Sequence, residues 1–492
     1  MPRCIFSTRD KCHVCSTKAL YVGIIKLSPN HNSSGKNDKP SLSLSRSILS
    51  NKIIFIVCLF VVIALISDAS LARTSTLLSP NLDVESGPIV VFTLISIACI
   101  VGQFMILRFV RERSKEIQAR ANLRFHRTYK VSVAVQITLN IILLFVILQL
   151  LVISSYFVLA LGAAITISYA LGIAMMVLLM KSFLFWFRTS RNFVILAYSI
   201  SAATLAIHLG ITLFFAASVL LDVSPEVQTA VSRTPFFMPG TIKFILNNIH
   251  GLTSILSFSI LWGATVLLLH HYSRKVGRLK YWIIVTLPLV YFLSQFPALF
   301  LNVFGPAIKE NPLFFGYLLT FVFTLSKTVG GVLFGIAFWA ISRNIPPTGA
   351  VRDYLMISAL GFVLLFTSDQ ALVLLVIPYP PFGLAAVSIV GLSSYLIFVG
   401  IYYSAISLSH DDRVRHEIKK FAMKESKMLD SIGSAQFEKD LAERVTSVRR
   451  TEDLAAESLG VPHSVDEVEL RKYLDDVVRE MKSSRKNKDK DK

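Results

Sequence analysis

Two ionisable residues inside long apolar segments are the strongest candidates for chemistry in this sequence. Lys327 lies near the centre of the apolar run 313–341, and Asp369 lies in the next run, 353–377. An ammonium group at mid-membrane costs roughly 2.5 to 3.5 kcal/mol on insertion scales, so Lys327 requires a partner. Asp369 is the best intramembrane counter-charge, and we predict an ion pair between these two residues.

The depths of the two residues permit this contact. Lys327 is 14 residues from the predicted outer end of its run and Asp369 is 8 residues from the outer end of its own. The six-residue difference corresponds to ~9 Å along the helix axes, most of which a lysine side chain covers. Because burial and pairing change the proton affinity of both groups, the pair is a candidate proton or ion relay. The alternative is a structural pair that locks two helices together.

A polar stripe on the run 281–304 supplies further candidates. Pro288, Gln295 and Asn302 are seven residues apart, so they share one helix face, and Tyr291 lies beside them. Proline frees backbone carbonyls and kinks a helix. This face can therefore line a substrate path, or its amides can hydrogen-bond to neighbouring helices as packing contacts.

Two other apolar runs carry short polar faces. His208 lies at helical spacing with Ser201, Thr204 and Thr212, and Gln136 precedes Asn140 by one turn. We include His208 in the candidate polar path. Its alternative role is an interhelical hydrogen bond, which is the more common role for a single buried histidine.

Metal and enzyme signatures are weak or missing. Cys4, Cys12 and Cys15 with His13 offer zinc-type ligands, but the Cys-x7-Cys spacing matches no common zinc motif. The sequence has no Walker loop, HExxH, GxSxG or dinucleotide-binding motif. We therefore predict no catalytic residue, no cofactor and no metal site.

The composition is that of a membrane protein. The 492 residues are 53% hydrophobic and 16% charged, with a mean hydropathy of +0.61, whereas soluble proteins are near ~45 to 50% and ~25%. About ten runs have the apolar length of a membrane-spanning helix. They lie near residues 53–72, 89–107, 131–151, 159–180, 193–221, 248–271, 281–304, 313–341, 353–377 and 382–408.

The basic residues predict the orientation. The net charge is +19, and of the 31 Lys and Arg residues before residue 409, 26 fall in alternate connecting segments. This is the pattern of cytoplasmic loops, so both termini are predicted to be cytoplasmic. The loop from Arg108 to Lys130 holds eight basic residues and is expected to contact anionic lipid headgroups. The charge therefore requires no nucleic-acid partner.

The predicted fold is all-α, a polytopic helix bundle with a cytoplasmic helical tail. The parts are a disordered basic segment (1–52), the transmembrane bundle (53–408), the amphipathic tail (409–484) and a disordered charged end (485–492). The run 53–66, followed by Ser70-Leu71-Ala72, fits either a first span or a cleaved signal peptide. The 52 residues before it favour a span.

The tail carries a helical stripe of apolar residues. The stripe runs from Val414 to Ala435 and resumes at Leu441 after Gly433 and Gln436, and a shorter second helix is predicted over 464–481. Such a face can pair with a second copy of the chain or with another protein.

Three functions fit these observations: a membrane sensor or scaffold that couples the bundle to the tail, a secondary transporter, or an embedded enzyme. A transporter would use Lys327, Asp369 and the 281–304 stripe. The sequence indicates only Lys327, Asp369 and His208 as ionisable groups well inside the spans. Ion-coupled transporters usually have more polar groups within the membrane, so we prefer the sensor or scaffold.

Overall fold

The computed structural model describes most of the apolar part of the chain and one helix of the tail. The described residues are 40–78, 86–118, 123–221, 226–227, 240–296, 310–343, 345, 350–375, 378–410 and 426–459. Two compact units divide the chain, Met1–Ile53 and Ile54–Lys492, and the contacts below belong to the second. The predicted Cys4, Cys12 and Cys15 cluster, Asn302 and the second tail helix lie outside the described residues.

The described residues form an all-α membrane fold. Nine of their helices are long and apolar enough to cross a bilayer. These are α2 (Pro40–Leu78), α3 (Ser86–Gln118), α4 (Leu123–Ile153), α5 (Val158–Ser190), α6 (Phe193–Leu220), α7 (Ile242–Leu269), α11 (Pro312–Arg343), α12 (Ala350–Ser368) and α14 (Leu384–His410). The all-α, multi-pass prediction is thus confirmed in its coarse form. The count of ten is not.

Shorter elements connect and flank these helices. They are β1 (Tyr156–Phe157), which pairs antiparallel with β2 (Glu226–Val227), the 3-10 turn η1 (His270–Tyr272), α8 (Ser273–Val276), α9 (Arg278–Leu293), α13 (Ala371–Leu374) and the tail helix α16 (Ser426–Leu459). Asn192 caps α6, because its side chain accepts a hydrogen bond from the Val194 amide at 3.0 Å.

The predicted span 281–304 is described only as far as Phe296. Its described helix, α9, has 16 residues, which is short for a bilayer crossing. It runs antiparallel to α7: the Tyr281 hydroxyl donates to the Val266 carbonyl at 3.0 Å, and the Trp262 indole donates to the Val285 carbonyl at 2.8 Å. Helix α9 thus begins the return from the end of α7 toward the start of α11.

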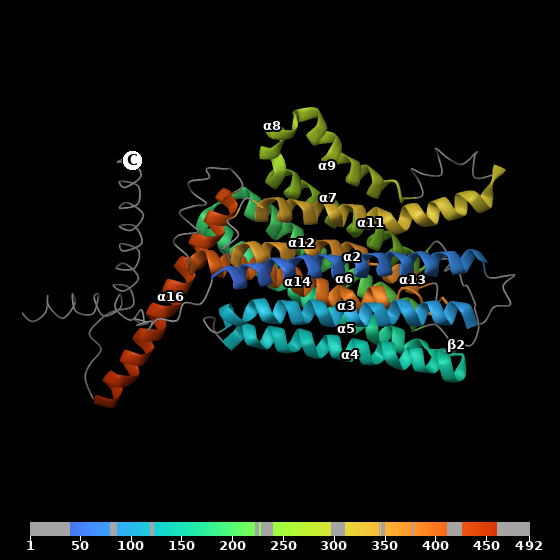
Figure 1. Cartoon of the computed structure of the whole chain (residues 1–492), viewed down its shortest axis with the longest axis horizontal. Coiled ribbons are helices and arrows are strands. Elements are labelled where there is room, and N and C mark those ends of the chain that lie inside the picture. The colour runs from blue at the N-terminus through green and yellow to red at the C-terminus, as the bar shows by residue number, and fades with distance from the viewer. Residues whose placement is uncertain are drawn as a thin grey trace, which may run out of the picture. The chain divides into compact units, whose positions relative to one another are not determined.

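Helix α14 is the centre of the bundle. Its apolar residues are buried along its whole length, and it packs against α12, α5, α4 and α3. Figure 1 shows the long helices lying alongside one another. Outer helices instead expose large apolar side chains such as Leu94, Phe104 and Ile141, which suits contact with lipid acyl chains.

The tail helix packs against its own chain. Its first half contacts α5 and α14, where the Trp186 indole donates to the Gln436 side chain at 3.1 Å and Gly433 lies against Leu408. The two residues that interrupt the predicted apolar stripe are therefore contact residues. Helix α16 begins at Ser426, and the earlier stripe residues from Val414 lie outside the described part of the chain.

Small residues bring α11 close to α12. A Cβ atom on Gly335 would lie 2.8 Å from the Ala359 carbonyl oxygen and 2.7 Å from the Val363 side chain, and one on Gly331 would lie 2.8 Å from Phe366. Backbones approach this closely only where a side chain is missing. The contact matters because α11 carries Lys327 and α12 leads to Asp369.

We expect Gly335→Leu to separate α11 from α12 and to destabilise the bundle by about 1 to 3 kcal/mol, the usual cost of overpacking. Chemical unfolding in detergent micelles measures this loss. Gly263→Leu on α7 is the matched control, since a Cβ atom there meets nothing within 4 Å. Equal stability of the two variants would contradict the close packing of α11 on α12.

Candidate functional site

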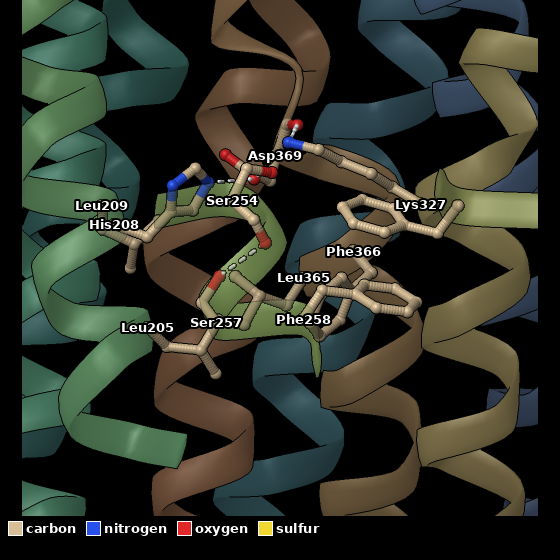
Figure 2. Close-up of a pocket in the computed structure, with 11 residues that line it drawn as sticks. Leu205, His208, Leu209, Ser254, Ser257, Phe258, Lys327, Leu365, Phe366 and Asp369 are labelled. Carbon is tan, nitrogen blue, oxygen red and sulfur yellow. Dashed lines mark hydrogen bonds and ion pairs between the residues drawn. The ribbon is translucent and has the colours of Figure 1, made fainter. Parts of the chain in front are cut away.

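The carboxylate of Asp369 is the centre of a buried polar site. The Lys327 ammonium lies 2.7 Å from Asp369 Oδ2, and the Tyr169 hydroxyl donates to Oδ1 at 2.7 Å. His208 Nε2 lies 3.3 Å from Oδ2. Figure 2 shows Lys327 and His208 approaching Asp369 from opposite sides. Groups from α5, α6 and α11 therefore meet at one acidic residue.

The helix is broken where this acid lies. The sequence predicted one continuous run over 353–377, but α12 ends at Ser368 and α13 begins at Ala371. In a continuous helix the Val373 amide would donate to the Asp369 carbonyl; here it donates to Gln370 at 2.9 Å. The Lys327 ammonium takes its place, 3.1 Å from the Asp369 carbonyl oxygen. One lysine thus satisfies both the side chain and the freed backbone oxygen.

A second histidine extends the site toward α7. The His208 and His250 rings are 5.0 Å apart, and His208 Nδ1 lies 3.4 Å from the Thr253 hydroxyl. Both rings are buried. Either ring nitrogen of His208 can donate or accept a hydrogen bond. His208 therefore connects the Asp369 carboxylate with the Thr253 hydroxyl on α7.

The space beside the ion pair is small. A cavity of about 10 Å³ is lined by Lys327, Asp369, His208 and the α7 hydroxyls of Ser254 and Ser257, as Figure 2 shows. Phe258, Phe292 and Phe366 close its apolar side. That volume suits about one water molecule. In this conformation the site can exchange a proton, but it has no room for an organic solute.

The predicted polar path is only partly assembled. Gln295 lies near the site, since it accepts a hydrogen bond at 3.1 Å from Ser326, the neighbour of Lys327. Tyr291 is half-buried and does not line the cavity. Asn302 lies outside the described residues. The structure therefore brings together Lys327, Asp369 and His208, with Gln295 beside them.

Sequence reasoning did not select three of the buried titratable residues that make polar contacts. Tyr169 and His250 belong to the Asp369 site, and a second buried aspartate, Asp68, lies on α2. The count of three ionisable groups inside the spans was therefore too low. The sequence contains a signal for Asp68, because an acid inside an apolar run is costly. It contains no such signal for Tyr169, since tyrosine is common in apolar helices.

Within the described residues, no group of three or more histidine, cysteine or acidic side chains is arranged to hold a metal ion. The site is instead a charge pair with hydrogen-bond donors around the carboxylate. Its available chemistry is proton transfer among a carboxylate, an imidazole and an ammonium.

No protein family, curated protein or solved structure matches this chain. The apolar helices make it a multi-pass membrane protein.

We expect Lys327→Met to lower the unfolding free energy by about 3 kcal/mol, because it leaves a buried carboxylate without its cation. Adding Asp369→Asn to that variant should restore most of the loss, since the charge is then gone too. Unfolding in detergent micelles measures both. Arg108→Met is the control: it removes an exposed pair with Glu112, worth less than about 1 kcal/mol. Additive effects of the two core substitutions would contradict a coupled ion pair.

Proposed function

We propose that this membrane protein is a sensor in which the protonation state of the Asp369 site controls the docking of the tail helix α16. The observation that carries the proposal is that one helix, α5, holds both. Tyr169 on α5 donates to Asp369, and Trp186 on α5 donates to Gln436 of α16. Seventeen residues, ~26 Å of helix, separate the two contacts.

The α5 end that binds the tail is well packed. The Trp186 ring stacks on Tyr402 of α14 at 5.9 Å and meets Phe183 edge-on at 5.5 Å. The Ser409 hydroxyl donates to Asp440 at 3.2 Å, and Gln436 donates to the same carboxylate at 2.9 Å. A small shift or rotation of α5 would thus alter several tail contacts together, which is how packed interfaces respond to a local change.

The small volume of the cavity supports sensing over transport. A signal-coupled bundle needs an event at Asp369 but no solute path, and the cavity beside Lys327 has room for about one water molecule. Protonation of Asp369 would remove the charge that holds Lys327 and would weaken the hydrogen bond from Tyr169. The released Tyr169 hydroxyl is the first link to α5.

The proposal includes ten crossings with both termini in the cytoplasm. Ring contacts place Phe258 of α7 against Phe334 of α11, and Tyr272 after α7 donates to Ala340 near the end of α11. These two helices therefore run parallel, which supports a return crossing between them, and α9 would begin that return. The alternating basic segments favour a cytoplasmic tail.

Two interactions at the membrane ends belong to the same proposal. The segment from Arg108 to Lys130 would bind anionic headgroups, and the second half of α16, which is charged, would meet a protein partner or a second copy.

The first span, 53–72, is proposed to stay uncleaved, since Ala72 is buried in the core with Leu65.

We expect Asp369→Asn, which mimics the protonated acid, to loosen the tail. Amide hydrogen exchange over 428–440, followed by mass spectrometry in nanodiscs, should become about tenfold faster, a change of ~1.4 kcal/mol in local opening. Asp353→Asn is the matched control, because it removes the charge of a different aspartate, which pairs with Arg113 at 3.1 Å. Trp186→Phe should also loosen the tail directly. Unchanged tail exchange in Asp369→Asn, with faster exchange in Trp186→Phe, would refute the coupling.

A second candidate, secondary transport, is favoured by the interruption of the helix at Asp369. Broken helices with freed carbonyls mark the substrate and ion sites of many transporters. The same residues, Lys327, Asp369 and His208, would then bind the coupling ion, with Gln295, Tyr291 and Asn302 along the path.

Proton flux into proteoliposomes separates the two functions. With an imposed membrane potential and an internal pH dye, the sensor should leak no faster than empty liposomes, because a sensor needs no proton path across the membrane. A proton flux that exceeds this background and vanishes in Lys327→Met would contradict the sensor function and support the transporter function.

A further inference from the structure

A second buried acid lies away from the Asp369 site. The Asp68 side chain on α2 is fully buried. Its Oδ2 atom accepts a hydrogen bond at 3.0 Å from the Ala386 amide, in the first turn of α14. Its Oδ1 atom is also buried but has no hydrogen-bond partner among the described residues. Half of this carboxyl group is therefore satisfied and half is not.

Asp68 differs from Asp369 in that no described side chain forms an ion pair with it. The apolar parts of the helices that surround it contain no Lys, Arg or His: residues 53–72, 87–107, 131–153 and 384–409. The titratable side chain that faces it from α3 is the buried thiol of Cys99. The first turn of α14 supplies only the partial charge of a helix N-terminus. An unpaired carboxylate in hydrocarbon is costly, and such groups are usually neutralised by a proton.

A column of buried polar groups starts at this acid. Ser96, Cys99 and Gln103 follow one face of α3 at steps of three and four residues. Gln103 donates to the Ser388 hydroxyl at 2.9 Å, two residues beyond Ala386. Gln136 of α4 donates to Gln103 at 2.6 Å. The column thus joins α2, α3, α4 and α14.

The four helices of this column carry buried side-chain oxygen atoms that have no hydrogen-bond partner. Nine buried side-chain oxygen atoms in the described residues lack a partner, and seven of them lie on these four helices. They belong to Asp68, Ser96, Ser132, Gln136, Asn140, Ser394 and Tyr395. Native proteins leave few such atoms unsatisfied, and bridging waters are the common solution in a polar interior. A continuous chain of hydroxyls, amides and water molecules is also a route along which a proton can move.

We propose that Asp68 is a second proton-binding site and that the column connects it to water. In the binding step, hydronium in the column transfers H⁺ to Asp68 Oδ1: one O–H bond of hydronium breaks, one O–H bond forms on the carboxyl group, and water remains. No electrons are exchanged. The neutral acid keeps its Oδ2 contact with the Ala386 amide and gains a donor on the oxygen that lacked a partner.

Infrared difference spectroscopy of the full chain in nanodiscs tests the protonation state directly. At neutral pH we expect a carboxylic acid C=O band that disappears in Asp68→Asn, an isostere that keeps an acceptor for Ala386. Asp369→Asn should leave the band in place, because Asp369 is ion-paired. No Asp68-dependent band in either sodium or choline buffer would show a carboxylate that merely caps α14, and would overturn the proposal. A band that appears only when choline replaces sodium would assign the site to a metal cation and would overturn it too.

Exchange into heavy water tests the column. The C=O band of a buried acid shifts when its proton is replaced by deuterium, and the rate of that shift reports access. We expect Gln136→Leu to slow the exchange at least tenfold. Thr138→Val on the same helix is the matched control, since Thr138 is exposed and bonds only to Ala134 of its own helix. Equal rates in both variants would show that protons reach Asp68 by another route.

Discussion

The carboxylate of Asp369 is the point on which three other helices converge. Burying one charge in a bilayer is costly, and the structure meets that cost with Lys327 at 2.7 Å and with hydrogen-bond partners from Tyr169 and His208. Each partner comes from a different helix. The position of α5, α6 and α11 around the end of α12 therefore depends on one side chain, and any change in its charge acts on all of them.

The close packing of α11 on α12 follows from the same requirement. Lys327 reaches both the side chain and the backbone carbonyl of Asp369, which it can do only because Gly331 and Gly335 let the two backbones approach. The ammonium then replaces the amide that would have continued the helix. The break in the helix is thus part of the ion pair, and it leaves α13 as a separate short turn.

Much of this was predictable from the sequence, and the rest was not for physical reasons. The all-α membrane fold follows from apolar run lengths, and the pairing of Lys327 with Asp369 was proposed from their depths alone. The break at Asp369 has only a weak local signal, the polar residues Thr367 to Gln370, and it comes with a long-range competition for one carbonyl. Tyr169 and Trp186 became significant only through contacts more than 190 residues away in the sequence.

The two buried acids show two solutions to one electrostatic problem. Asp369 is held by a lysine and can stay charged, so its neighbours must keep their places for the charge to persist. Asp68 instead has the backbone amides of Gly383 and Ala386, and the apolar parts of the four helices contain no Lys, Arg or His, so a bound proton is the simplest way to make it stable there. The bundle thus holds one buried acid that is paired with a lysine and one whose described hydrogen-bond donors are backbone amides.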